Sequence, residues 1–173
     1  MPGDIVAVRS QTRFGKLIRA ALGSYTNHNG MIVRGADKNF WIGEAVQPFS
    51  KLTSLAEYER AMANGLVVRI WRVPHATDIE REDVAKYFTD FLIGLKYPVT
   101  VASLCIYRIV NHLPFTIHGD WCTKLDFKAW GHVDSNIFNR PDGKKKKNPT
   151  PRTLENRLVA GVINDVTNEC VGI

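Results

Sequence analysis

The sequence predicts an α+β fold in which a small antiparallel sheet packs against helices. Short β-branched or alternating runs are concentrated in the first half of the chain, whereas runs with helical spacing of apolar residues lie mostly in the second half. Two of the strand-like runs are separated only by GADKN, which has the length of a hairpin connection. No internal repeat is visible, and 173 residues are most economically one domain, spanning 1–173.

Four segments are expected to be strands: DIVAVR at 4–9, HNGMIVR at 28–34, NFWIGEAV at 39–46 and LVVRIWRV at 66–73. The first alternates between apolar and polar residues, and all four contain β-branched or aromatic residues, which favour extended backbone. The second and third should pair as a hairpin.

Helical spacing and capping residues predict helices at 12–23, about 54–63, from 77 to about 92, about 100–112, from near Trp121 to Gly131, and from 150 to 160. TDIE at 77–80 is a capping box, and the helix it opens should turn five apolar residues inward: Ile79, Val84, Phe88, Phe91 and Leu92. In the final helix Thr150 is the expected N-cap and Pro151 occupies the first helical position.

Composition excludes disorder and a fibrous protein, since 45% of residues are hydrophobic and 23% are charged. Much of the net charge of +6 comes from Lys144, Lys145, Lys146 and Lys147, in a basic loop at about 140–149 that contains Pro141, Gly143 and Pro149. This loop is either a solvated segment or a contact for an anionic polymer or membrane surface. Nucleic acid is not an expected partner, because no aromatic residues are interleaved with the lysines.

Localisation follows from three observations. The start of the chain, 1–10, lacks a basic region followed by an apolar one, so no signal peptide is expected. The most apolar segment, 99–117, contains an arginine, an asparagine, a histidine and a proline, which favours a buried helix over a membrane span. Cys105, Cys122 and Cys170 form no even disulfide framework. We expect a cytoplasmic protein, or one that is phage-encoded or injected.

Cys122 is the candidate nucleophile. It lies in the first turn of an expected helix with Asp120 as N-cap, where free backbone N–H groups and the helix dipole stabilise a thiolate. A thiolate nucleophile needs a base, and the base needs an orienting partner. His28 at the start of one strand and Glu44 in the neighbouring strand could supply both, because side chains on one face of antiparallel neighbours can touch.

Each candidate also has a structural alternative. A cysteine near a helix start is often a small buried hydrophobe, and a histidine near a strand end is often only hydrogen-bonded structure. Glu44 is harder to explain in this way, because an unpaired carboxylate in a buried strand is costly. His118, Asp120 and Cys122 could be metal ligands, but no fourth ligand has standard zinc spacing, so neither a metal nor another cofactor is expected.

The order of segments resembles the circularly permuted branch of the NlpC-type papain-like hydrolases, the YiiX-like and lecithin:retinol acyltransferase-like group. GDIVAVRS…LIRAALGSYTNHNGMIV is similar to the family opening, GDI followed by a strand, a helix and S-x-x-SH-x-G. Further similarities, in order, are WIGEAV to the EA strand, VVRIWRV to the basic strand, GLKYPV to the glycine–tyrosine turn, DWCTKLDF to the nucleophile helix and TPRTLE to a later P-x-x-L. The resemblance covers roughly 3–154.

This resemblance implies a permuted papain-like fold in which Cys122 is the nucleophile, His28 the general base and acid, and Glu44 the residue that orients the imidazole. The chain order His–Glu–Cys is the order of this permuted branch. Beside these residues the chain departs from the family pattern at Asn27, Asn29, Trp121, Thr123 and Lys124.

The implied function is a cysteine hydrolase that cleaves an amide or peptide bond through an acyl-enzyme; an ester or thioester is the less favoured alternative. The implied substrates are a peptidoglycan stem peptide, an isopeptide, or an acyl amide or acyl lipid. The alternative from another class is a non-catalytic binding module that keeps the papain fold to dock a cell-wall polymer or a protein partner.

Overall fold

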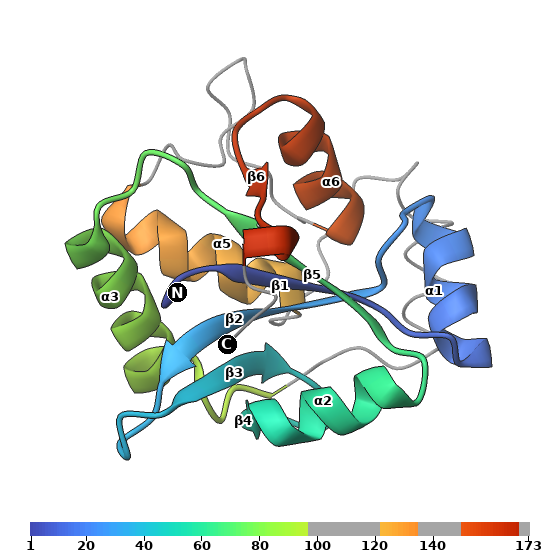
Figure 1. The fold of residues 1–173 in the computed structure, drawn as a ribbon, viewed down its shortest axis with the longest axis horizontal. Helices are drawn as coiled ribbons and strands as arrows, with labels where there is room; N and C mark the ends of the chain where they lie inside the picture. Colours follow the sequence, from blue (N-terminus) through green and yellow to red (C-terminus); the bar gives the residue numbers. More distant parts are fainter. Residues whose placement is uncertain (97–121, 135–149, 170–173) are drawn as a thin grey trace.

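The structure, a computed structural model, describes residues 1–96, 122–134 and 150–169 (Figure 1). Its described part is α+β, as the sequence predicts: a six-stranded antiparallel sheet in the order β4-β3-β2-β1-β5-β6 packs against helices. None of the helices in these ranges has the length and apolar character that crossing a bilayer requires. The assignment of the whole chain to one domain stays a prediction.

The strands are β1 (Ile5–Arg9), β2 (His28–Arg34), β3 (Phe40–Ala45), β4 (Ser50–Ser54), β5 (Val67–Arg72) and β6 (Asn164–Asp165). The α-helices of the described residues are α1 (Arg13–Leu22), α2 (Leu55–Ala63), α3 (Asp78–Tyr87), α5 (Cys122–Val133) and α6 (Pro151–Val159). A π-helical segment η1 (Phe88–Leu92) continues α3, and a 3₁₀ turn η2 (Thr167–Glu169) follows β6.

Strand alternation divides the apolar side chains between two cores, one on each face of the sheet. The larger core contains Met31, Val33 and Trp71 of the sheet together with residues of α3, η1 and α5. The smaller core lies on the opposite face and contains Val6, Val8, Ile42 and Tyr58, the last contributed by α2. The site described below lies at the start of β2 and combines side chains from both faces of the sheet.

The residues that precede β1 join three other elements. The fully buried carboxylate of Asp4 accepts hydrogen bonds from Arg72 at the end of β5 (2.9 and 2.7 Å) and from Arg81 of α3 (3.2 Å). The indole N–H of Trp130 in α5 donates to the Gly3 carbonyl at 3.2 Å. These contacts hold α3 and α5 against the same face of the sheet.

All four expected strands are present, and two further strands are not predicted by the sequence. β4 has the short polar sequence SKLTS, which carries little strand signal, and it is held by its pairing with β3. β6 has two residues and pairs with the end of β5. Both are defined by long-range hydrogen bonding, which local composition does not encode.

The inward face predicted for the helix from residue 77 is partly wrong. Val84, Phe88 and Leu92 are buried, but Ile79 is 75% exposed and Phe91 is 63% exposed. Ile79 lies nine residues before Phe88, or about two and a half helical turns, so the two side chains point to opposite sides of the helix. Phe91 follows the change from α to π geometry at Phe88, and the wider turn rotates it outward.

Other expectations have mixed outcomes. α5 continues past the predicted stop at Gly131 to Val133, and Thr150 and Pro151 begin α6 as predicted. Several predictions lie outside the described residues: the helix at 100–112, the N-cap Asp120, the alternative ligand His118, the cysteines Cys105 and Cys170, and the basic loop at 140–149 with Lys144 to Lys147.

The Asp4 cluster yields a stability prediction. Asp4→Ala should lower the free energy of unfolding by about 3–5 kcal/mol, because it leaves the buried Arg81 without its carboxylate and removes one of the two carboxylates that pair with Arg72. The control is Glu82→Gln, which breaks the Arg34–Glu82 pair between two half-exposed side chains and should cost at most about 1 kcal/mol. Urea denaturation measures both. Equal losses would show that Asp4 does not anchor the fold.

Candidate active site

The backbone register places His28 and Glu44 on the same face of the sheet. His28 is the first residue of β2, and Gly30, two residues further on, pairs with Glu44 of β3. A side chain at Gly30 would crowd this approach, since a Cβ there would lie 2.9 Å from the Gly43 carbonyl oxygen and 3.2 Å from Glu44 Cβ. Glycine therefore leaves the space in which the imidazole and the carboxylate meet diagonally across the strand pair.

Three donors surround the buried carboxylate of Glu44. Nε2 of His28 lies 2.6 Å from Oε2, the Tyr58 hydroxyl donates to the same oxygen at 2.8 Å, and the Thr53 hydroxyl donates to Oε1 at 2.5 Å. Burial raises the Glu44 pKa, but the hydrogen bonds and the charge of His28, together with Thr53 and Tyr58, lower it to about 2. The carboxylate is therefore charged at neutral pH and can orient and stabilise an imidazolium.

Cys122 is the first residue of α5, and its thiol meets the other side of the imidazole. Burial raises the thiol pKa, but hydrogen bonding and Coulombic attraction from His28, with smaller contributions from the Asn29 N–H and Thr123, lower it overall. Burial likewise lowers the His28 pKa, whereas hydrogen bonds and charges from Cys122 and Glu44 raise it to about 10. Because Nε2 faces Glu44, Nδ1 is left for the thiol. The arrangement favours a thiolate–imidazolium pair.

The three predicted residues are thus brought together, although they come from both faces of the sheet. Glu44 belongs to the face that carries Tyr58, whereas Cys122 packs in the larger core on the opposite face. They meet because His28 stands at the end of β2, where α5 begins. Their catalytic roles stay predictions.

Two of the departures from the family pattern contact each other. The Thr123 hydroxyl, next to Cys122, donates to the Asn29 side-chain oxygen at 3.2 Å, and both residues are fully buried. Asn29 also follows His28 and contributes its backbone N–H to the thiol. This pair therefore ties the start of α5 to the start of β2. The sequence marks both positions as unusual but does not indicate that they meet.

Asp126 is a buried group near the site that sequence reasoning missed. It lies one turn after Cys122, is fully buried, and neither of its carboxyl oxygens has a hydrogen-bond partner among the described residues. Burial and the negative charge of Cys122 raise its pKa well above the usual value, which favours the protonated acid. The i,i+4 spacing to Cys122 was the available signal, because it places both side chains on one helix face.

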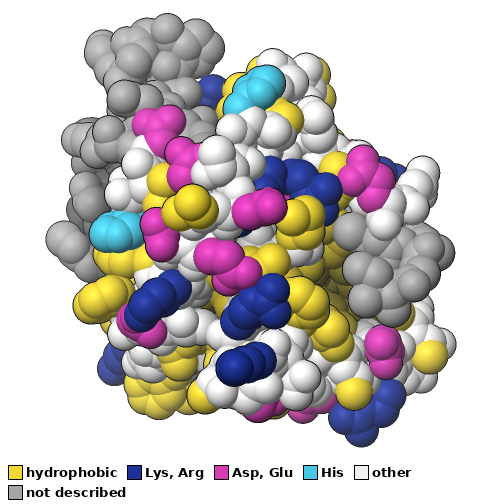
Figure 2. Space-filling view, turned by 60° about the vertical axis from the view of Figure 1, so that its left-hand side comes forward, with side chains coloured by type: hydrophobic (Ala, Val, Ile, Leu, Met, Phe, Trp, Pro, Cys, Tyr) yellow, Lys and Arg dark blue, Asp and Glu magenta, His cyan; other side chains and the backbone are white. Residues whose placement is uncertain are grey.

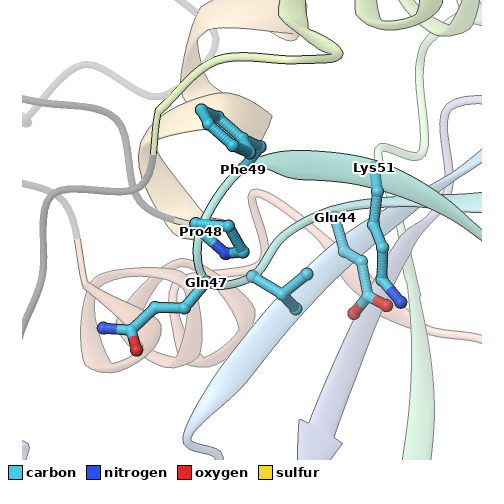
Figure 3. Close-up of a pocket in the computed structure, with 6 residues that line it drawn as sticks. Glu44, Gln47, Pro48, Phe49 and Lys51 are labelled. Carbon is cyan, nitrogen blue, oxygen red and sulfur yellow. The ribbon is translucent and has the colours of Figure 1, made fainter.

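A cavity of about 410 Å³ opens beside the Glu44 carboxylate. Glu44 and Lys51 are register partners on β3 and β4 and extend side by side, with Pro48 and Phe49 in the connection between the strands (Figure 3). Val46 and Gln47 complete the lining. The cavity offers apolar contacts with one nearby cation.

The described residues do not present a metal centre. No group of three or more histidine, cysteine, aspartate or glutamate side chains within them is arranged to hold an ion. One ring nitrogen of His28 is taken by Glu44 and the other faces Cys122. His118 and Asp120, the alternative ligands, lie outside the described ranges.

The raised pKa of Asp126 yields a pH prediction. Between the ordinary aspartate pKa of 3.8 and the higher folded value, the folded protein binds a proton that the unfolded chain has lost, so stability falls as pH rises. Asp126→Asn removes this dependence. The unfolding free energy of the variant minus that of wild type should increase by up to about 1.4 kcal/mol for each pH unit above about pH 4.

The matched control is the exposed Asp83 of α3, whose change to asparagine should leave a curve parallel to that of wild type. Urea denaturation from pH 4 to 8 makes the comparison. A constant difference between wild type and Asp126→Asn would show that Asp126 is ionised in the folded protein.

Comparisons with known proteins place the fold. No family model matches this chain, and no curated protein matches it. Among solved structures, the chain is similar to the crystal structure of the metalloprotein YiiX from Escherichia coli O157:H7, with a TM-score of 0.57 and 21% sequence identity. The match covers 78% of this chain and 67% of that one. This chain therefore shares the α+β fold of YiiX.

Proposed function

We propose that this protein is a cysteine hydrolase that cleaves an amide or peptide bond through an acyl-enzyme. The observation that carries the proposal is the buried chain of thiol, imidazole and carboxylate formed by Cys122, His28 and Glu44. Such a chain supplies an activated nucleophile, a proton carrier and a group that orients the carrier.

The reaction needs only these groups, the substrate and water. The Cys122 thiolate attacks the carbonyl carbon, and His28 gives its proton to the leaving amine, which departs as a thioester forms on the sulfur. A water molecule then attacks the thioester while His28 takes its proton. The acyl group leaves as a carboxylic acid and the thiolate–imidazolium pair returns. Glu44 stays ionised throughout, as its pKa of about 2 requires.

We also propose that this protein belongs to the circularly permuted NlpC-type group of papain-like hydrolases. The fold shared with YiiX supports the YiiX-like part of the resemblance. The circular permutation of an NlpC-type papain-like domain and the link to the lecithin:retinol acyltransferase-like group rest on the motif order His28, Glu44, Cys122.

The substrate classes remain a peptide, a peptidoglycan stem peptide, an isopeptide and an acyl amide. The cavity beside Glu44 supports a substrate with an apolar portion next to the scissile bond, which would contact Pro48 and Phe49. Lys51 would favour a negatively charged group at the same place. The solved neighbour is named a metalloprotein, but no cluster of side chains within 1–96, 122–134 and 150–169 fits a metal centre, and the reaction above requires none.

One observation favours the alternative of a non-catalytic binding module. Cys122 is only 5% exposed, as a structural cysteine in an apolar core would be. Against it stands the Glu44 carboxylate, whose three donors and charged state have no purpose in packing alone. The reactivity of the thiol separates the two functions.

Cys122 should therefore react with iodoacetamide far faster than Cys105 or Cys170 at pH 6. Its lowered pKa leaves a larger thiolate fraction there than an ordinary thiol has, and the reactivity of an ordinary thiol falls about tenfold per pH unit below about 8.5. Peptide mass spectrometry of the labelled native protein measures the three rates. His28→Ala is the control, since without the imidazole the Cys122 rate should drop toward that of the others.

Between pH 6 and 8 the Cys122 rate should change less with pH than the rates of the other two cysteines, because its pKa is lowered. Hydrolysis should fail as pH rises toward 10, where His28 loses the proton it gives to the leaving group. Equal labelling of all three cysteines in the folded protein would remove the nucleophile assignment and leave the binding module.

Glu44→Gln should keep the fold and lose less activity than His28→Ala or Cys122→Ala, because Glu44 acts only through the imidazole. Glutamine has a single acceptor oxygen, so it can replace only one of the two oxygens that accept from Tyr58 and Thr53. It also removes the charge that raises the His28 pKa. The upper pH limit of kcat/KM should consequently move to lower pH, which a purely structural residue would not cause. Unchanged turnover per folded molecule, with a lower melting temperature, would make Glu44 structural.

A further inference from the structure

Helix α1 turns apolar side chains outward. Phe14 and Leu17 are 46% and 49% exposed, and their spacing of three residues places them on the same side of the helix. An amphipathic helix of a globular protein normally turns its apolar stripe toward the core. In α1 the single buried residue is Gly15.

The protein holds α1 by its other side. Gly15 packs so closely on Ser10 that a Cβ would lie 2.9 Å from the Ser10 side chain. Arg19 donates to the Ser10 carbonyl and, at 3.2 Å, to the Asn27 side chain. Because successive residues turn by about 100°, Leu17 points roughly opposite to Gly15. The outward direction of the stripe is therefore set by how the helix is attached.

The charged residues of α1 itself are all positive. Arg13 and Lys16 are exposed on the helix, and its sequence, RFGKLIRAAL, contains no acidic residue. Apolar side chains flanked by cations match the boundary between lipid headgroups and acyl chains of an anionic bilayer. A second copy of this chain fits less well, because a symmetric contact would bring Arg13 and Lys16 toward their own copies.

Exposure alone does not distinguish α1. Ile79 on α3 is more exposed, at 75%, but Asp78 and Glu80 flank it. The side of the molecule that carries α3 mixes acidic and basic side chains, with apolar ones between them (Figure 2). An anionic surface would be repelled from Ile79 and attracted to α1, which makes Ile79 a matched control.

We propose that α1 docks this protein on an anionic lipid surface, with Phe14 and Leu17 inserted between headgroups and Arg13 and Lys16 paired with lipid phosphates. The loop 23–27 joins α1 directly to His28, so docking would bring the start of β2 close to the bilayer. This interaction is independent of the proposed hydrolase activity, and it can be measured without a substrate.

The experiment is co-sedimentation of the full chain with vesicles of phosphatidylcholine alone or mixed with phosphatidylglycerol. Wild type should bind the mixed vesicles and not the neutral ones, and binding should weaken as salt rises. Phe14→Ser with Leu17→Ser should lower partitioning about tenfold or more, because it removes the two inserted side chains. Lys16→Glu should weaken binding on mixed vesicles, whereas Ile79→Ser should bind as wild type does. Matching circular dichroism spectra establish that each variant is folded.

Three outcomes would overturn the proposal. The first is equal binding by wild type and the Phe14→Ser, Leu17→Ser variant. The second is binding that disappears when Lys144 to Lys147 are changed to serine but persists without Phe14 and Leu17, which would assign it to the basic loop. The third is concentration-dependent dimerisation in sedimentation velocity that the same double variant abolishes, which would make a second copy the occupant of the α1 surface.

Discussion

The pairing register of β2 with β3 is the constraint on which both the fold and the candidate site depend. It sets Gly30 opposite Glu44 and Met31 opposite Gly43, so alternate residues face α2 on one side and the helical layer of α3, η1 and α5 on the other. Phe88 packs so tightly on Gly43 that a Cβ there would lie 2.5 Å from its ring. A slip of one residue would exchange the two faces, burying the Glu44 carboxylate in the larger core and separating it from His28.

Three buried carboxyl groups compensate the free-energy cost of removing a carboxylate from water in different ways. Asp4 accepts hydrogen bonds from two arginines, and Glu44 is charged because three donors, the His28 imidazolium among them, compensate its burial. Asp126 has no such donors among the described residues, and its raised pKa favours its neutral form. Low local polarity strengthens the pairing of the first two and penalises ionisation of the third. The thiolate–imidazolium pair at Cys122 depends on this contrast, because Glu44 supplies the negative charge that Asp126 does not.

The proposed site and the proposed docking helix are neighbours in sequence and differ in kind. The site lies in the interior, where its groups are buried, paired and shifted in pKa. The hydrogen bond between Thr123 and Asn29 joins α5 to β2 beside it. The α1 surface is exterior: Phe14 and Leu17 are about half exposed, and the charged residues of α1 are all positive. Burial holds the catalytic side chains of the proposed site in one geometry. An exposed apolar surface beside cations is instead typical of a site that binds a partner.

The sequence by itself determined β1, β2, β3, β5, the capped helices and the prospect that His28 and Glu44 would meet. Each follows from local information: residue period, β-branched composition, caps and a hairpin-length turn. Only the tertiary structure decided that Tyr58 would donate to Glu44, that Asp126 would be buried without a donor, and that Ile79 would face solvent. These depend on which surfaces pack together and at what depth. The periodicity of apolar residues in the sequence indicates the type of each helix or strand, but long-range packing decides which residues each of its faces contacts.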